Sequence, residues 1–344
     1  MIGRIIKLLL NWVTGKPSML FTNVLLTHRC SQNCLQCTIP QQITVNEFMK
    51  FEDFKLILKR LIKQGTLGLT LSGGDPMLHP EIEKFIEYAH KKKFIRLHLL
   101  TTLYYDEKTM DKLLRILERY PISMSCSFDG FGEVADTLRG AKNVSETVEM
   151  NMRRINNHLR ARGLKRKLGV NIVTSQKNLY QVIDVIKFIE KIGWRANLDI
   201  YRWRSENQNE NDELKITDFT EFDKVIKYAI DSPAVWSHDW LIKGYRDYLE
   251  YSFVKICPYL LMPTVGSKFF INPDGKVEVC FGEPVGNLLE QEASEIFKSD
   301  KWQRKLEQFR QCKGCWNSCY TLSVGLFRFK HLRDILKAGK LIKS

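Results

Sequence analysis

The chain has 344 residues, of which 44% are hydrophobic and 27% are charged, so a disordered chain and a collagen-like repeat are excluded. Its net charge is +14, and its nine cysteines are too dilute for a small disulfide scaffold. No apolar run reaches the roughly 18–20 residues of a membrane span, and no cleavable secretory signal is visible. We therefore expect a reducing cytoplasm, in which thiolates are available to bind metal.

Strands and helices are predicted to alternate over the first 200 residues. The predicted strands are 21–26, 67–71, 95–100, 122–127, 168–174 and 197–203. Helical periodicity occupies 46–63, 80–92, 107–120, 145–158 and 179–192. Repeated βα units of this kind predict an α/β fold with a parallel sheet, here a partial (β/α)6 TIM-type barrel.

The chain is predicted to divide into five parts. These are an amphipathic N-terminal segment (1–19), the barrel (20–204), a mainly helical connector (205–256), a small cysteine-rich α+β domain (257–320) and a basic amphipathic tail (321–344). Within the small domain, the turn Asn272-Pro273-Asp274-Gly275 predicts a β-hairpin between residues 269–271 and 277–280.

Three predicted strands carry polar side chains on one face. The polar sets are Ser123, Ser125 and Ser127; Asn197, Asp199, Tyr201 and Trp203; and Arg96, His98 and Thr102. Fully buried parallel strands are normally continuous apolar runs. The polar face therefore predicts an open barrel lined for a polar ligand, and a solvent-facing sheet edge is the alternative. Cys126 faces away from the serines and is predicted to be a core residue.

Cys30, Cys34 and Cys37 form a C-x3-C-x2-C motif directly after the first strand, at the end where α/β barrels place their chemistry. Three close thiolates can hold a [4Fe–4S] cluster through three irons and leave the fourth iron open to a ligand. A zinc site would want a fourth ligand, and His28 lies awkwardly close to Cys30. A structural zinc knuckle remains the alternative.

This motif resembles that of the radical SAM superfamily, as does the glycine-rich turn Ser72-Gly73-Gly74-Asp75-Pro76 after the second strand. The resemblance implies that the three thiolates hold the catalytic cluster and that the turn binds the amino group of S-adenosylmethionine. It also implies cofactor contacts for Ser127 (ribose), Arg139 (carboxylate), Asp129 and Asn171. Gln36, a further cofactor candidate, stands where the family often has an aromatic residue beside the adenine.

Five further cysteines lie in the last quarter of the chain, and their spacing resembles the auxiliary-cluster region called twitch in its short form and SPASM in its longer form. They are Cys257, Cys280, Cys312, Cys315 and Cys319. The longer form holds two clusters and needs more cysteines, so the resemblance implies one auxiliary [4Fe–4S] cluster. Cys319 is a fifth candidate that could replace Cys315. A zinc ribbon is the alternative.

The resemblance implies that the reduced cluster donates an electron to S-adenosylmethionine, and that the resulting 5′-deoxyadenosyl radical abstracts a substrate hydrogen atom. A flavodoxin- or ferredoxin-type protein would supply the electron. We predict a radical SAM oxidoreductase whose auxiliary cluster serves oxidation or bond formation on a polar small-molecule, sugar or lipid-linked substrate. Few residues precede the first strand, so the extra peptide-binding domain of many peptide modifiers is not expected here.

Several other functions remain open. One is a maturase that modifies a peptide or protein; another is a non-catalytic iron–sulfur electron carrier or sensor. Residues 321–344 carry a net charge of +5, and residues 1–13 are also basic and apolar. These ends predict contact with an anionic membrane surface or an acidic partner. Terminal helices docked on the barrel with their charges in water are the alternative. No recognised nucleic-acid-binding motif accompanies the charge.

Overall fold

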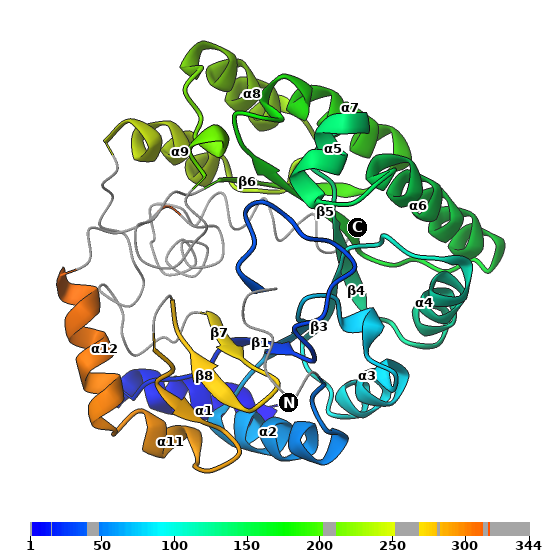
Figure 1. Cartoon of the computed structure of the whole chain (residues 1–344). Helices are drawn as coiled ribbons and strands as arrows, with labels where there is room; N and C mark the ends of the chain where they lie inside the picture. The colour runs from blue at the N-terminus through cyan, green and yellow to red at the C-terminus, as the bar shows by residue number, and fades with distance from the viewer. Residues whose placement is uncertain are drawn as a thin grey trace.

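The structure is a computed structural model, which describes residues 2–14, 16–39, 48–201, 211–251, 268–280, 283–311 and 316. Its centre is a parallel sheet (Figure 1) of β1 (Phe21–Leu25), β2 (Gly68–Ser72), β3 (Arg96–Thr101), β4 (Ser123–Ser127), β5 (Leu168–Thr174) and β6 (Arg195–Ile200). These strands are hydrogen-bonded in sequence order, and every neighbouring pair is parallel. The predicted α/β fold with a partial barrel is confirmed.

Helices cover the outer side of the curved sheet (Figure 1). They are α2 (Phe51–Gln64), α3 (Ile82–Lys91), α4 (Glu107–Arg119), α6 (Val144–Ala161), α7 (Val182–Ile192) and α8 (Phe219–Asp231). Local sequence sets their ends. The Asp106 carboxylate accepts a hydrogen bond from the Thr109 amide at 2.8 Å and caps α4. Gly65 and Gly193 adopt positive φ and end α2 and α7.

The two faces of the sheet differ in polarity, as the alternation of β4 predicts. Met124 and Cys126 are fully buried in the main core, so Cys126 is a core residue. Ser123 and Ser127 point to the opposite side, since successive side chains of a strand alternate, and both are half-buried. In β5 and β6 the half-buried residues of this side include Asn171, Asn197 and Asp199. Because the helices cover the outer side, the polar residues line the inside of the barrel.

The sheet continues past β1 into the C-terminal part of the chain. Strand β7 (Lys268–Ile271) pairs parallel to β1, and β8 (Lys276–Glu278) and β9 (Gly286–Asn287) follow antiparallel. The predicted hairpin is confirmed, since the Gly275 amide donates to the Asn272 carbonyl at 2.9 Å within the turn. The small C-terminal unit therefore shares one sheet with the barrel, and it also contains α11 (Ala293–Ile296) and α12 (Asp300–Gln311).

Some boundaries differ from the predictions. The helix predicted from residue 46 begins at Phe51, and the sixth strand spans Arg195–Ile200 instead of 197–203. Trp203 lies outside the described residues. The segment interpreted as a connector contains α8 and α9 (Asp239–Tyr251). Helix α5 (Gly132–Arg139) and the 3-10 turns η2 (Pro76–Leu78), η3 (Leu179–Gln181) and η4 (Asp212–Leu214) were not predicted.

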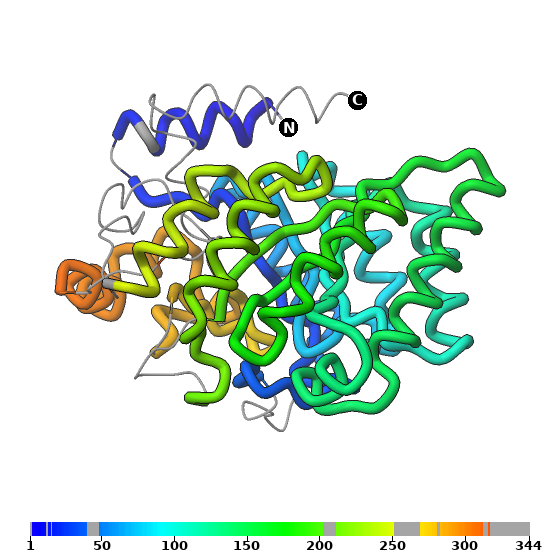
Figure 2. Tube along the Cα trace, turned by 90° about the horizontal axis from the view of Figure 1, so that it is seen from above, coloured from blue at the N-terminus to red at the C-terminus, as the bar shows by residue number. Residues whose placement is uncertain are grey.

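The N-terminal helix α1 (Ile2–Val13) lies on one side of the barrel, and the loop that carries the first three cysteines lies on the opposite side (Figure 2). The cysteine loop follows the C-terminal end of β1, so α1 marks the N-terminal ends of the strands. No helix within the described ranges is long and apolar enough to cross a membrane.

Candidate functional site

The cysteine loop is held by backbone hydrogen bonds on two sides. On one side, the amides of Gly74 and Asp75 donate to the carbonyls of Thr27 and Arg29, each at 2.8 Å. On the other side, the amides of Asn33 and Leu35 donate to the last carbonyls of α5, each at 3.0 Å. The loop therefore joins the glycine-rich turn after β2 to the end of α5, and Cys30, Cys34 and Cys37 lie between them, each half-buried.

The glycine-rich turn approaches the cysteine loop too closely for any side chain. A Cβ at Gly73 would lie 2.2 Å from the Thr27 carbonyl oxygen, and one at Gly74 would lie 2.2 Å from the Arg29 carbonyl oxygen. Gly73 also has φ +149°, which disfavours other residues. Both glycines are thus required for the turn to lie against the backbone that leads into Cys30.

Asp75 fixes this turn from the inside. Its carboxylate is completely buried and accepts hydrogen bonds from the Met77 amide (2.9 Å), the Thr102 amide (3.0 Å) and the Tyr105 hydroxyl (2.6 Å). Burial raises the pKa of Asp75 above its usual range, and burial beside Asp75 raises the pKa of Tyr105 well above its usual value. Pro76 is buried directly after it, at the start of η2. The carboxylate therefore ties the turn to the loop after β3.

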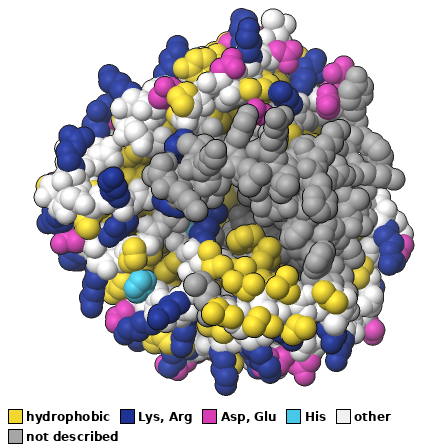
Figure 3. All heavy atoms as spheres, turned by 180° about the vertical axis from the view of Figure 1, so that it is seen from behind, with side chains coloured by type: hydrophobic (Ala, Val, Ile, Leu, Met, Phe, Trp, Pro, Cys, Tyr) yellow, Lys and Arg dark blue, Asp and Glu magenta, His cyan; other side chains and the backbone are white. Residues whose placement is uncertain are grey.

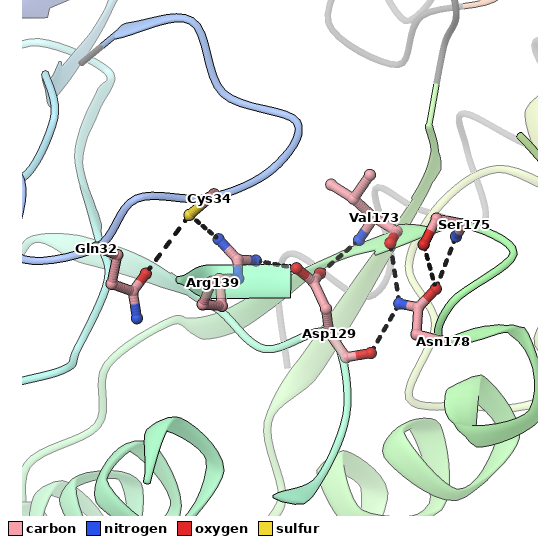
Figure 4. A network of polar contacts seen from close by, with 7 residues as sticks. All are labelled: Gln32, Cys34, Asp129, Arg139, Val173, Ser175 and Asn178. Carbon is pink, nitrogen blue, oxygen red and sulfur yellow. Dashed lines mark hydrogen bonds and ion pairs between the residues drawn. The ribbon is translucent and has the colours of Figure 1, made fainter. Parts of the chain in front are cut away.

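Helix α5 delivers Arg139 to the cysteine loop. The helix ends at Gly140 with φ +59°, and a Cβ there would lie 2.2 Å from the Asn33 carbonyl oxygen. The Arg139 side chain is buried, with Nη1 3.7 Å from the Cys34 sulfur and Nη2 in an ion pair with Asp129 (Figure 4). Burial alone would lower the pKa of the guanidinium, but the charge of Asp129 raises it above its ordinary value. A fixed positive charge thus stands beside Cys34.

Asp129 extends this contact to the end of β5, as Figure 4 shows. Its carboxylate accepts from the Val173 amide at 2.8 Å, and its own carbonyl accepts from the Asn178 side chain at 2.7 Å. Asn178 in turn accepts from the Ser175 amide at 2.7 Å. The predicted cofactor residue Asp129 is therefore buried and oriented toward Arg139, not toward open space.

The other predicted cofactor residues lie around the same opening. Ser72 ends β2, and its carbonyl accepts from the Leu26 amide at 2.9 Å. Ser127 and Asn171 are register partners on β4 and β5, on the inner side of the barrel. Gln36 lies within the cysteine loop, and its buried Oε1 has no hydrogen-bond partner among the residues that the structure describes. All of these residues belong to the C-terminal ends of the strands or the loops that follow them.

Three polar contacts, one in the cysteine loop and two inside the barrel, were not predicted. The Cys34 thiol lies 3.9 Å from Oε1 of the buried Gln32. Deeper in the barrel, His98 Nδ1 is 2.8 Å from the Ser123 hydroxyl, and Ser237 donates to Asn197 at 3.0 Å. The alternating polar pattern of β3 and β4 does indicate the His98–Ser123 pair, whereas Gln32 carries no signal beyond its place between two cysteines.

Of the eight cysteines predicted to bind iron–sulfur clusters, the structure describes Cys30, Cys34, Cys37 and Cys280. Burial raises the pKa of the Cys30 thiol to about 12 and also raises the pKa of Cys37, so a cation is needed to hold them as thiolates. Cys280 is half-buried with φ +59° just after β8. The remaining auxiliary candidates lie outside the described residues: Cys257, Cys312, Cys315 and Cys319. In the described part of the chain, no three His, Cys, Asp or Glu side chains converge on a single-ion site.

Comparison with known proteins identifies the family. The model of the Radical SAM superfamily matches residues 24–189, and the SPASM model, an iron–sulfur cluster-binding domain, matches residues 263–320. The chain belongs to the radical SAM superfamily. It is a radical SAM enzyme with a C-terminal SPASM iron–sulfur domain, and its cofactors are a [4Fe–4S] cluster and S-adenosylmethionine.

Two curated relatives of this radical SAM enzyme differ in how much of it they match. The antilisterial bacteriocin subtilosin biosynthesis protein AlbA of Bacillus subtilis (strain 168) is 22% identical over 327 residues, which cover 87% of this chain and 68% of AlbA. The GTP 3′,8-cyclase of Sulfurimonas denitrificans is 28% identical over 185 residues, which cover 50% of this chain and 53% of the cyclase.

The fold of the radical SAM enzyme is also that of a solved structure. Streptococcus suis SuiB bound to its precursor peptide SuiA superposes with a TM-score of 0.63 at 16% identity, covering 87% of this chain and 68% of SuiB. This chain thus spans about two thirds of the length of both AlbA and SuiB.

Proposed function

We propose that this radical SAM enzyme modifies a peptide or protein substrate. The observation that carries the proposal is the extent of the similarity to AlbA, which covers 87% of this chain, whereas the similarity to the GTP cyclase covers 50%. AlbA is named for the biosynthesis of a bacteriocin. The peptide-modifying alternative of the sequence analysis is therefore better supported than a sugar or lipid-linked substrate.

The residues of the site fit the proposed cofactors. Three thiols stand on one loop, and Gly73 and Gly74 let the glycine-rich turn lie directly against the backbone that leads into Cys30. Among the described residues, the buried polar atoms without a hydrogen-bond partner include two of this site, the Oε1 acceptor of Gln36 and the Nε donor of Arg139. When bound, the cluster and S-adenosylmethionine supply one-electron chemistry that removes a hydrogen atom from the substrate.

In this proposal Cys30, Cys34 and Cys37 hold the catalytic cluster. The Arg139 guanidinium stabilises negative charge at Cys34 and offers Nε to the carboxylate of S-adenosylmethionine. Asp129 is a positioning residue, because its carboxylate holds Arg139 and its backbone is fixed by Asn178.

The remaining cofactor contacts in this proposal are those that the resemblance to the family implies. The glycine-rich turn would bind the amino group, with Asp75 as the buried anchor of that turn. Ser127 would contact the ribose and Asn171 would be a further cofactor contact. Gln36 would offer a polar side chain near the adenine, where the family often has an aromatic residue.

The inner face of the barrel would hold the substrate. Asn171 and Asn197 are joined side by side, with the Asn197 amide donating to Asn171 Oδ1 at 3.2 Å. Asp199 is on the same face of β6, one pleat nearer the cysteine loop. Such amides can donate to and accept from peptide groups, and the helices behind the sheet exclude water from that side.

For the SPASM domain we propose one auxiliary [4Fe–4S] cluster. Its ligands would be Cys257, Cys280, Cys312 and Cys315, or Cys319 in place of Cys315. The cluster would accept an electron from the substrate radical left after hydrogen abstraction, and a flavodoxin- or ferredoxin-type protein would reduce the catalytic cluster.

The proposal is tested by supplying candidate substrates to the reconstituted enzyme. Under anaerobic conditions with dithionite and S-adenosylmethionine, a short peptide encoded beside this gene should increase 5′-deoxyadenosine formation. The mass of the peptide should fall by the mass of the hydrogen atoms removed. GTP at the same concentration is the matched comparison. If GTP is consumed and the peptide is unchanged, a cyclase-like activity replaces the proposed function.

A further inference from the structure

The N-terminal helix α1 exposes the apolar face that an ordinary surface helix buries. Six large apolar residues recur at helical spacing along one side, and 40–78% of the surface of each is exposed: Ile2, Ile5, Ile6, Leu9, Leu10 and Val13. A surface helix normally buries such a stripe against the core. We call these six side chains the apolar stripe.

The opposite, polar side of α1 holds the helix on the protein. Arg4 donates through Nη2 to the Lys92 carbonyl at 2.5 Å, at the end of α3, and its guanidinium lies 4.7 Å from the centre of the Phe94 ring. Asn11 is buried and donates to the Ser18 hydroxyl at 3.0 Å. Because these contacts fix the orientation, the outward position of the apolar stripe is a built feature of the fold.

Positive charge borders the apolar stripe. Helix α1 contains no acidic residue, and Lys7, Lys16 and Lys93 are exposed. Among the residues that the structure describes, no acidic side chain pairs with any of these three lysines. Figure 3, seen from behind, shows hydrophobic side chains gathered in a patch, with Lys and Arg side chains on the described surface beside it.

The same end of the barrel exposes two further apolar side chains. Ile95, which directly precedes β3, is 57% exposed, and Trp236 is 52% exposed. The Arg96 guanidinium lies 5.8 Å from the centre of the Trp236 ring, so Trp236 also stands at the N-terminal end of β3. Tryptophan is enriched where proteins meet the polar boundary of a membrane. The cysteine loop lies on the opposite side of the molecule (Figure 2).

We propose that α1 seats this enzyme on an anionic membrane surface, with the apolar stripe among the acyl chains and Lys7, Lys16 and Lys93 against the headgroups. An interfacial helix of this kind combines an apolar face with flanking cations and lies in the plane of the membrane. Two copies joined stripe to stripe would instead bring these lysines together with no described acidic side chain to pair with them, which disfavours self-association. In the proposed orientation the catalytic opening faces away from the lipid.

The proposal is tested by flotation of the full-length enzyme with lipid vesicles. It should float with vesicles of phosphatidylcholine containing about one third phosphatidylglycerol and remain unbound with phosphatidylcholine alone. The double variant Ile6→Asp/Leu9→Asp should lose binding by at least tenfold. The double variant Lys7→Glu/Lys93→Glu should weaken binding by about fivefold or more, and salt should weaken the wild type.

Matched controls are available on other surfaces. Met150, on α6, is 58% exposed, and Lys227, on α8, is also exposed, so Met150→Asp and Lys227→Glu should float like the wild type. Circular dichroism and unchanged 5′-deoxyadenosine formation would show that each variant is folded. Failure of the wild type to float, or flotation of the Ile6→Asp/Leu9→Asp variant, overturns the proposal. The proposal is also overturned if neither the wild type nor this variant floats, and sedimentation shows that the wild type is a dimer and the variant a monomer.

Discussion

The two ends of the barrel are built in opposite ways. At the C-terminal ends of the strands, ionisable groups are buried: Asp75 is hydrogen-bonded, Asp129 and Arg139 form an ion pair, and each is at most 7% exposed. At the N-terminal ends, the apolar stripe of α1 stands in solvent. Burying charge is costly unless every group is paired, so the first end is held in one geometry. Exposed apolar side chains do not require a fixed geometry of partners, so the second end is suited to contact with a deformable partner.

The largest expected effect concerns the thiols at the first end. Cys30→Ala should abolish formation of 5′-deoxyadenosine, because three thiolates are needed to hold the catalytic cluster. Iron content should fall from about eight to about four per chain if one auxiliary cluster is present. Cys126→Ala is the matched control, since Cys126 lies in the core; it should keep all the iron and lose about 1 kcal/mol of stability. Cleavage by the Cys30 variant would refute the assignment.

A pair of glycine substitutions compares the two ends directly. Gly73→Ala places a Cβ 2.2 Å from the Thr27 carbonyl oxygen and should destabilise the fold by about 3 kcal/mol or more, with loss of cofactor cleavage. Gly3→Ala in α1 meets nothing within 4 Å and should stabilise by about 0.5–1 kcal/mol. Thermal unfolding measures both. If both substitutions change the thermal stability by the same small amount, the turn after β2 does not pack tightly against the cysteine loop.

The buried carboxylate of the glycine-rich turn gives a pH-dependent prediction. Asp75→Asn leaves at least one donor of Thr102 or Tyr105 without an acceptor and should cost about 1–3 kcal/mol. The folded-state pKa of Asp75 is raised by burial, so its contribution to stability is fully present below the unfolded-state pKa and is lost as the pH rises through the folded-state value. Chemical denaturation should therefore show that the difference in free energy of unfolding between wild type and variant becomes smaller from acidic to neutral pH. A difference that grows over this range would contradict the prediction.

The smallest expected effect concerns the ion pair beside Cys34. Arg139→Lys cannot reach Asp129 and Cys34 with one planar group, and it should lower cofactor cleavage by about 10–100-fold. Asp129→Asn removes the charge that holds Arg139 and should raise the KM for S-adenosylmethionine more than it lowers kcat. Reconstituted iron content should stay near that of the wild type in both. An unchanged KM in both variants would place Arg139 outside the cofactor site.

Much of the site follows from local sequence. Hydrophobic periodicity locates the strands, and a cysteine motif directly after β1 must lie at the C-terminal end of a parallel sheet. The glycines at 73 and 74 signal close backbone approach. The inner polar face of β4 follows from the alternation of Ser123, Ser125 and Ser127 with apolar residues.

Other features depend on contacts between distant segments. Helix α5 has only eight residues, and it supports the cysteine loop because its last carbonyls accept hydrogen bonds from the amides of that loop. The inward position of Asp75 depends on Thr102 and Tyr105, which belong to the loop after β3. The pairing of β1 with β7 joins segments more than 240 residues apart, and no local pattern predicts it. The outward stripe of α1 also depends on Arg4 reaching the end of α3.

The most direct test of the account follows the abstracted atom. The enzyme would be incubated with S-adenosylmethionine, dithionite and a peptide encoded beside this gene, uniformly deuterated at its carbon-bound positions. We predict that deuterium appears in 5′-deoxyadenosine and that the peptide loses it in equal amount. Deuterium transfer from labelled GTP, with none from the peptide, would contradict the proposed peptide-modifying function.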